Sequence, residues 1–171
     1  VTTFMIAKLF SDDERINAND TNFTINQRTS KTVEDTFYNI QNNTNGFFNF
    51  LLLIKNDPSY EEQVDVLFDD LCSRNKEIKF IYTTDIGIKL SKDFRLVQPD
   101  AAEIFSNFLG KNPVIVKEVM NGQIHIKSLV DYFKSQNMVC IMYSHFNPLT
   151  NKNDFVSVGF DITKLNETCT D

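Results

Sequence analysis

The chain has 171 residues, a formal net charge of −6, and 42% apolar and 23% charged residues. This length suffices for one domain with a substantial core, and the composition is that of a globular rather than a disordered chain. An acidic chain without a Lys/Arg cluster does not favour nucleic acid as a partner, because phosphate binding needs a basic surface. Sixteen Phe and no Trp predict a core filled mainly by phenylalanine.

The opening segment, VTTFMIAKLF, is apolar but shorter than the ~20 residues that span a bilayer. It lacks the basic start and the small-residue cleavage site of a signal peptide. Two interpretations stay open: the end of a membrane helix that precedes this sequence, or an ordinary first helix or strand. Residues 11–30 are polar, rich in Asn, Asp and Thr, and low in helix propensity.

The next segment predicts a long helix with one buried face, because apolar residues recur at spacings of three, four and seven. They are Val33, Phe37, Ile40, Phe47, Phe48, Leu51 and Ile54. The stretch Asn42–Gly46 weakens this helix, so a kink or a break within it stays open. Asp57 and Pro58 then predict the N-cap and first position of a second helix. Its apolar stripe is Tyr60, Val64, Leu67, Phe68 and Leu71.

Alternating apolar residues then predict strands. Residues 78–91 form a hairpin with its turn at 84–87, and further strands lie at 123–129, 138–146 and 154–162. Helices are expected at 98–111, with Asp100 near the start and Gly110 as the stop, and at 113–120. Strands joined by tight turns are antiparallel. The fold class is therefore α+β: a long N-terminal helix packed on a roughly five-stranded antiparallel sheet.

Three stretches in this order resemble a Cache domain, an extracytoplasmic relative of PAS-type sensor domains. They are the long helix QRTSKTVEDTFYNIQNNTNGFFNFLL, the hairpin IKFIYTTDIGIKLS and the closing strands MVCIMYSHFNPLTNKNDFVSVGFDITKL. The likeness spans Arg28 to Leu165 and depends on the combination rather than on one motif. The segment DERINANDTNFTINQRTSKTVED is also similar to the start of periplasmic sensor regions of spirochete-type nucleotide cyclases.

The resemblance implies a periplasmic ligand-sensing domain of an inner-membrane receptor, such as a chemoreceptor, histidine kinase or cyclase. Residues 1–27 would lead from a membrane helix, 28–165 would form the sensor, and 166–171 would connect onward. The expected partners are a small molecule, for example an amino acid or organic acid, and a second copy bound through the N-terminal helix. The domain itself is expected to be no enzyme and to hold no cofactor.

The candidate ligand-binding residues are Tyr82, Arg95, Tyr132, Tyr143 and Asp161. Asp161 occupies the position where the amino-acid-binding subgroup of the resembled family places its amine-binding carboxylate. However, Arg95 is not followed by that subgroup's Trp and Tyr. Asp161 alternates with Ser157 and Gly159, whose small side chains would leave room for a ligand. The competing interpretation is a solvent-facing sheet side, with the tyrosines as core aromatics and Arg95 solvated beside Asp93.

Which residues of 138–146 share the face of Asp161 stays open, because a one-residue slip of the hairpin register exchanges the two faces.

No sequence motif indicates catalysis or a metal. The chain has no nucleophile elbow, zinc-protease motif or P-loop, and Asp69 and Asp70 are expected on a solvated helix face. The only histidines, His125 and His145, have no partners at metal-ligand spacing. The three cysteines contain no CxxC pair, and a disulfide between two of them stays open. We expect buried thiols at Cys72 and Cys140 and an exposed one at Cys169.

An alternative function is a secreted protein-binding glycoprotein, for example of viral origin, without a small-molecule ligand. It is motivated by Cys169 and by four glycosylation sequons, at Asn19, Asn22, Asn42 and Asn166. The discriminating observation is what surrounds this segment in the full gene: a membrane helix and a signalling domain, or a cleaved signal peptide.

Overall fold

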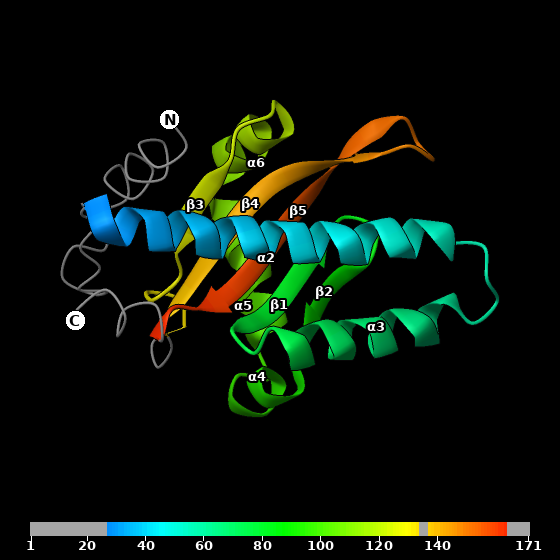
Figure 1. The fold of residues 1–171 in the computed structure, drawn as a ribbon, viewed down its shortest axis with the longest axis horizontal. Helices are drawn as coiled ribbons and strands as arrows, with labels where there is room; N and C mark the ends of the chain where they lie inside the picture. Colours follow the sequence, from blue (N-terminus) through cyan, green and yellow to red (C-terminus); the bar gives the residue numbers. More distant parts are fainter. Residues whose placement is uncertain (1–26, 134–136, 164–171) are drawn as a thin grey trace.

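The structure is a computed structural model that describes residues 27–133 and 137–163 (Figure 1). Five strands form one antiparallel sheet with helices on both faces, so the chain is α+β as predicted. The expected connector 166–171 and all but the last residue of the expected segment 1–27 lie outside the described residues. So do three of the sequons and one thiol, namely Asn19, Asn22, Asn166 and Cys169.

The last strand of the chain lies in the middle of the sheet. The strands are β1 (Ile78–Thr83), β2 (Gly87–Leu90), β3 (His125–Ser128), β4 (Met138–Asn147) and β5 (Lys152–Asp161). Their order is β2-β1-β5-β4-β3, and all neighbouring strands are antiparallel. β5 therefore pairs with β1, which comes early in the chain, as well as with β4 across a turn at 148–151.

The long helix α2 (Gln27–Leu53) crosses one face of the sheet, with α3 (Tyr60–Arg74) beside it (Figure 1). The predicted stripe forms the contact: Phe37, Ile40, Phe47, Phe48 and Leu51 are buried in one core with Ile81, Ile141, Val156 and Val158 of the sheet. The side chain of Val33 lies outside the described residues. α2 continues without a break through Asn42–Gly46, where the buried Thr44 Oγ1 donates to the Ile40 carbonyl over 2.6 Å.

The second helix starts later than predicted. α3 begins at Tyr60 with Ser59 as the N-cap, so the prediction of Asp57 as N-cap is wrong. Asp57 instead accepts hydrogen bonds from the backbone N–H and the hydroxyl of Ser59, at 2.8 and 2.6 Å. This local Asx turn satisfies the carboxylate before the helix begins.

Three short helices cover the opposite face: α4 (Lys92–Val97), α5 (Ala101–Lys111) and α6 (Pro113–Met120). Their buried residues Phe94, Phe105, Phe108, Ile115 and Val119 form a second core with Phe80, Cys140, Met142 and Phe155 of the sheet. The sequence did not predict α4. Gly110 does not stop α5, because that helix includes Gly110 and ends at Lys111.

A bulge in β1 places Ile78 and Phe80 on opposite faces of the sheet, although residues two apart in a regular strand share a face. Ile78 pairs with Phe160 and Phe80 with Gly159, so Lys79 has no partner in β5. The extra residue turns the strand. Ile78 consequently joins the core under α2, whereas Phe80 joins the core under α4 and α5.

None of the helices in the described part of the chain combines the length and apolar character needed to cross a membrane.

Candidate functional site

The register of the β4–β5 hairpin decides which candidate ligand residues share a face. Met138 pairs with Asp161 and Cys140 with Gly159, so these β4 side chains project to the same face as Asp161. Tyr143 projects to the other face and belongs to the core under α2. The structure therefore does not bring Tyr143 and Asp161 together in one pocket.

The face that carries Ser157 and Gly159 is filled by protein side chains. A Cβ atom at residue 159 would overlap the ring of Phe80, so this ring lies directly over the glycine backbone. The Cys140 thiol contacts the Ser157 hydroxyl, and both residues are fully buried. Burial raises the pKa of the Cys140 thiol to about 12, which keeps it neutral. The space that small residues would leave for a ligand is thus occupied by Phe80 and Cys140.

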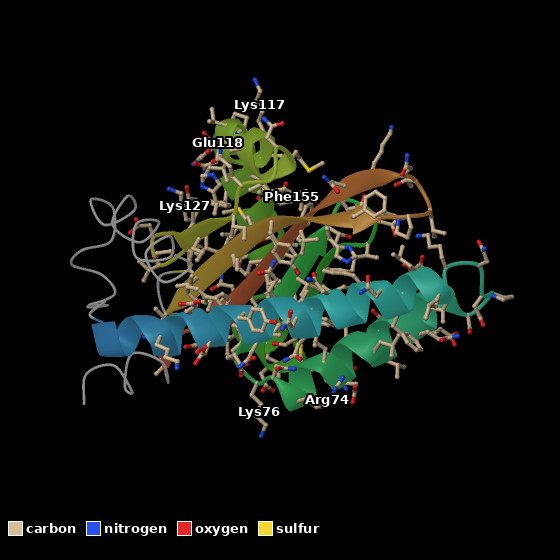
Figure 2. All side chains as sticks on the ribbon, turned by 45° about the horizontal axis from the view of Figure 1, so that its top comes forward. Arg74, Lys76, Lys117, Glu118, Lys127 and Phe155 are labelled. Atoms are coloured by element: carbon tan, nitrogen blue, oxygen red, sulfur yellow. The ribbon has the colours of Figure 1, made fainter. Side chains whose placement is uncertain are left out.

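Tyr82 and Tyr132 lie at the rim of this second core. The Tyr82 ring has its centroid 5.6 Å from that of Phe105 and 6.1 Å from that of Phe155, which is labelled in Figure 2. Tyr132 meets Phe108 edge to face at 5.2 Å. Both tyrosines are half-buried. Both pack as aromatics against the second core. They are the two candidate ligand residues that the structure places against the same core.

Arg95 and Asp161 use their polar atoms locally. Arg95 is exposed on α4, and its Nη2 donates to the Leu90 carbonyl over 3.3 Å. Asp161 Oδ1 accepts from the backbone N–H of Thr163 over 2.7 Å at the end of β5. Each residue therefore has a structural role that does not require a ligand.

A polar cluster that the sequence did not reveal lies under the C-terminal half of α2. It surrounds a small cavity of about 30 Å³, close to the volume share of a single water. The lining residues are Phe48, Leu51, Leu52, Tyr60, Thr83, Asp85, Ile86, His145, Asn147, Asp154 and Val156. They come from α2, α3, the β1–β2 hairpin and the β4–β5 hairpin. We call this set the α2 junction.

His145 is the titratable group at the centre of the α2 junction. Its ring centroid lies 5.9 Å from that of Phe48 on α2, and it pairs across the strands with Asp154. Asp154 Oδ2 accepts from Asn147 Nδ2 over 3.0 Å. Burial lowers the pKa of His145, and the nearby Asp154 carboxylate opposes this shift in part. The imidazole is therefore neutral at pH 7, and acid places a charge against α2.

Two further polar contacts attach α2 and the turn after it. The Tyr143 hydroxyl donates to Asn45 Oδ1 over 2.8 Å, which joins β4 to the middle of the helix. After the helix, Lys55 Nζ lies 2.7 Å from Asp85 Oδ2 in the β1–β2 turn and 4.5 Å from the ring centroid of Tyr60. The hydrogen bond to Asp85 raises the pKa of Lys55. Because this ion pair is partly exposed, it contributes orientation more than stability.

The described residues contain no group of three or more His, Cys, Asp or Glu side chains that could hold a metal ion. His125 Nε2 lies 2.7 Å from Glu118 Oε2 on α6, whose position is labelled in Figure 2. This contact does not have the geometry of a hydrogen bond, so the buried Nε2 of His125 has no hydrogen-bond partner among the described residues.

Comparisons of the chain with protein-family models, with curated proteins and with solved structures gave no match. The geometry defines an α+β protein in which a long helix packs on an antiparallel sheet. An apolar stripe and polar contacts along the C-terminal half of α2 hold the helix in place.

Proposed function

We propose that the chain is the extracytoplasmic, Cache-type ligand-sensing domain of a membrane-bound signal-transduction receptor, and that the domain itself is not an enzyme. The five-stranded antiparallel sheet with a long N-terminal helix on one face is the architecture that this resemblance implies. The proposal places the domain in the periplasm, as part of an inner-membrane protein.

One observation carries the proposal: the two ends of the described chain lie at the same end of the molecule. The start of α2 and the end of β5 lie together, while the β4–β5 turn and the end of α2 lie at the opposite end (Figure 1). The ring centroids of Phe37 in α2 and Phe160 in β5 are 5.4 Å apart, which agrees with this placement. A domain tethered to a membrane before α2 and connected onward after β5 needs both ends on one side.

The proposed signal is a shift of α2 relative to the sheet. A ligand drives such a shift only if it binds one arrangement more tightly than the other. The α2 junction and the Tyr143–Asn45 hydrogen bond are the contacts that would exchange between the two arrangements. They lie in the C-terminal half of α2, away from the end that would face the membrane.

The expected ligand is a small molecule such as an amino acid or organic acid. Binding beside Tyr82 and Tyr132 requires the rings of Phe105 and Phe108 to move, because they contact these tyrosines. Movement of Phe105 would reach β1 directly, since its ring centroid lies 4.9 Å from that of Phe80.

A thermal-shift screen against amino acids, organic acids and nucleobases tests ligand sensing, because a compound that binds the folded state raises Tm by mass action. Hydrogen exchange with a hit present then tests transmission. We expect altered protection in α2 and β4, where the two elements meet. A hit that leaves α2 unaffected would contradict the proposed signal, and a gene with no membrane segment before this domain would contradict the receptor itself.

The proposed receptor pairs with a second copy through α2. Between Asp35 and Lys55 this helix carries no charged residue, and its outer side exposes Tyr38, Phe50 and Leu53 at 64, 45 and 82%. The other exposed positions of this stretch are asparagines and Gly46, so no charge opposes the approach of the same helix from a second copy.

The β4–β5 turn favours a second candidate function, protein binding by a secreted glycoprotein. Phe146 and Leu149 are exposed there at 53 and 61%. Asn42, in the sequon Asn42–Thr44, is also exposed, on α2. Mass spectrometry of the protein from its natural source separates the candidates, because a glycan at Asn42 would occupy the helix face that the receptor needs for pairing.

A further inference from the structure

A surface hollow lies between the end of α3, the start of β1 and the start of α4. Its volume is about 320 Å³, at the lower end of the range for small-molecule sites. The lining residues are Asp69, Cys72, Ser73, Lys76, Ile78, Lys79, Ser91, Lys92 and Asp93. None of the five candidate ligand residues lines it, although Arg95 lies on the same helix as Lys92 and Asp93. It shares no residue with the α2 junction, and the proposed function does not use it.

The β1 bulge places Lys79 in this hollow. Lys79 is the residue without a partner in β5, and bulges characteristically re-aim a side chain. Its Nζ donates to the Lys76 carbonyl over 3.0 Å, which fixes the ammonium group beside the α3–β1 loop and leaves it two further donors. Among the described residues, neither Lys76 nor Lys79 forms an ion pair.

The charge of the hollow differs from that of the whole chain. The lining holds three lysines and two aspartates, whereas the chain as a whole has a formal charge of −6. Lys92 and Asp69 neutralise each other across the gap between α4 and α3, with Nζ and Oδ2 3.2 Å apart. The side chain of Lys76 extends outward at the rim (Figure 2). Lys79 is therefore the cation available inside.

The floor and wall are suited to a molecule with an apolar part. The half-buried Cys72 side chain is apolar in character, because burial raises the pKa of its thiol to about 12 and keeps it neutral. Ile78 also lines the hollow but is almost completely buried and offers a ligand little surface. On the opposite wall the Ser91 hydroxyl accepts from the N–H of Phe94 over 3.3 Å, which leaves its own hydrogen as a donor. The Asp93 carboxylate disfavours a second negative charge on the bound molecule.

We propose that this hollow binds a small organic monoanion, with the anionic group at Lys79 and Ser91 and the apolar part over Cys72. The inference goes beyond the proposed function, since binding here does not require that the chain be a sensor. A charge-assisted hydrogen bond from Lys79 supplies the preference for an anion.

The test is a titration of the chain with butyrate, butyramide and inorganic phosphate, followed by amide NMR shifts of Lys79, Ser91 and Lys92. Butyrate and butyramide have the same carbon skeleton and differ in charge, whereas phosphate is an anion without an apolar part. We expect saturable shifts with butyrate and at least tenfold weaker binding of the other two. Equal binding of butyramide would overturn the role of charge, and equal binding of phosphate would overturn the role of the apolar floor.

Lys79→Gln removes the inner cation and leaves a polar side chain of similar length. We expect it to weaken butyrate binding at least tenfold. The matched control is Lys111→Gln, an exposed lysine at the end of α5, which should bind as the unmodified chain does. Both variants should melt cooperatively with the same far-ultraviolet circular dichroism. If Lys79→Gln folds and binds butyrate as tightly as the control, or if no amide in the hollow shifts, the proposed site does not exist.

Discussion

Phe80 and Gly159 form a cross-strand pair in which an aromatic ring covers a glycine. Such pairs protect the glycine backbone from water and fix the register of the strands. The small residue Gly159 predicted room for a ligand, whereas in the structure the ring of Phe80 fills that space within the second core. The glycine correctly indicated a space above the strand. That the Phe80 ring fills this space depends on the pairing of β5 with β1, which is distant in sequence.

Gly159→Ala is expected to destabilise the fold by about 1–3 kcal/mol, because the new methyl group must displace a buried ring in a packed core. Urea unfolding measures the change. Gly110→Ala is the matched control: Gly110 lies in α5 with open space where a Cβ would be, so this change should stabilise by up to about 1 kcal/mol. Equal effects of the two substitutions would contradict the close packing at Gly159.

His145 makes the stability of the α2 junction depend on pH. Burial lowers its folded-state pKa below the ordinary histidine value of 6.5, so the unfolded chain binds a proton more readily than the native chain does. The contribution of neutral His145 is therefore fully present above about pH 7. The contribution declines as the pH falls below 6.5, the pKa of the unfolded chain, and the decline ends once the pH is below the lower pKa of the folded state. The facing charged groups are Asp154, Asp85 and Lys55, and of these Lys55 is already paired with Asp85.

Unfolding free energies at pH 7.5 and 5.5 check this expectation. The chain with His145 should lose more stability between these two values than His145→Gln does, because glutamine does not titrate. Comparison within this window cancels the contribution of His125, which both proteins share. A variant with the same pH dependence as the original chain would show that His145 is not the group that titrates on unfolding.

At the scale of elements, α2 is attached to the sheet both by apolar packing and by a specific hydrogen bond. Tyr143→Phe removes the hydroxyl that donates to Asn45, and we expect a loss of about 0.5–1.5 kcal/mol. Tyr38→Phe removes a hydroxyl from a largely exposed tyrosine on the same helix and should change stability little. A double-mutant cycle of Tyr143→Phe with Asn45→Ala measures the coupling, and a coupling of zero would mean that the bond contributes nothing in solution.

The elements themselves were largely predictable. Spacings of three and four gave α2 its bounds to within a few residues. Alternating apolar residues, and for β4 a continuous apolar run, identified the five strands. α4 was missed because it has only six residues and exposes Leu96 and Val97, so it shows no apolar periodicity. The prediction that Gly110 ends α5 is wrong because a glycine near a helix terminus has two possible roles. It can stop the helix, or the last turn can include it at a small cost.

The candidate site was much less predictable than the elements. The hairpin at 148–151 has Asn151 with φ of 55°, a conformation that Asn tolerates, and this turn sets the register of β4 against β5. From sequence alone either register was compatible with the apolar pattern, because both faces of β4 are apolar. The separation of Tyr143 from Asp161 follows from that register. The bulge at Lys79 gave no sequence signal.

At the scale of the whole molecule, the uncharged outer side of α2 predicts the oligomeric state. We expect sedimentation to give twice the chain mass of 19.8 kDa at high concentration. The variant Tyr38→Glu with Leu53→Glu should sediment as a monomer, because it places charges on the helix face that a second copy would cover. Val66→Glu, on the exposed side of α3, is the control and should keep the dimer. Sedimentation of the unmodified chain as a monomer at all concentrations would contradict pairing through α2.

The central place of β5 has a consequence for how the protein is made. Tyr82 pairs with Ser157, and Val139 with Phe160, so the middle of the sheet closes only after β5 (Lys152–Asp161) has left the ribosome. Until then β1 and β4 each present an unpaired edge, and such edges invite association between nascent chains. The sheet of this domain should therefore form late in its synthesis and slowly, after β5 has emerged. A premature stop before Lys152 should yield an insoluble product rather than a smaller folded one.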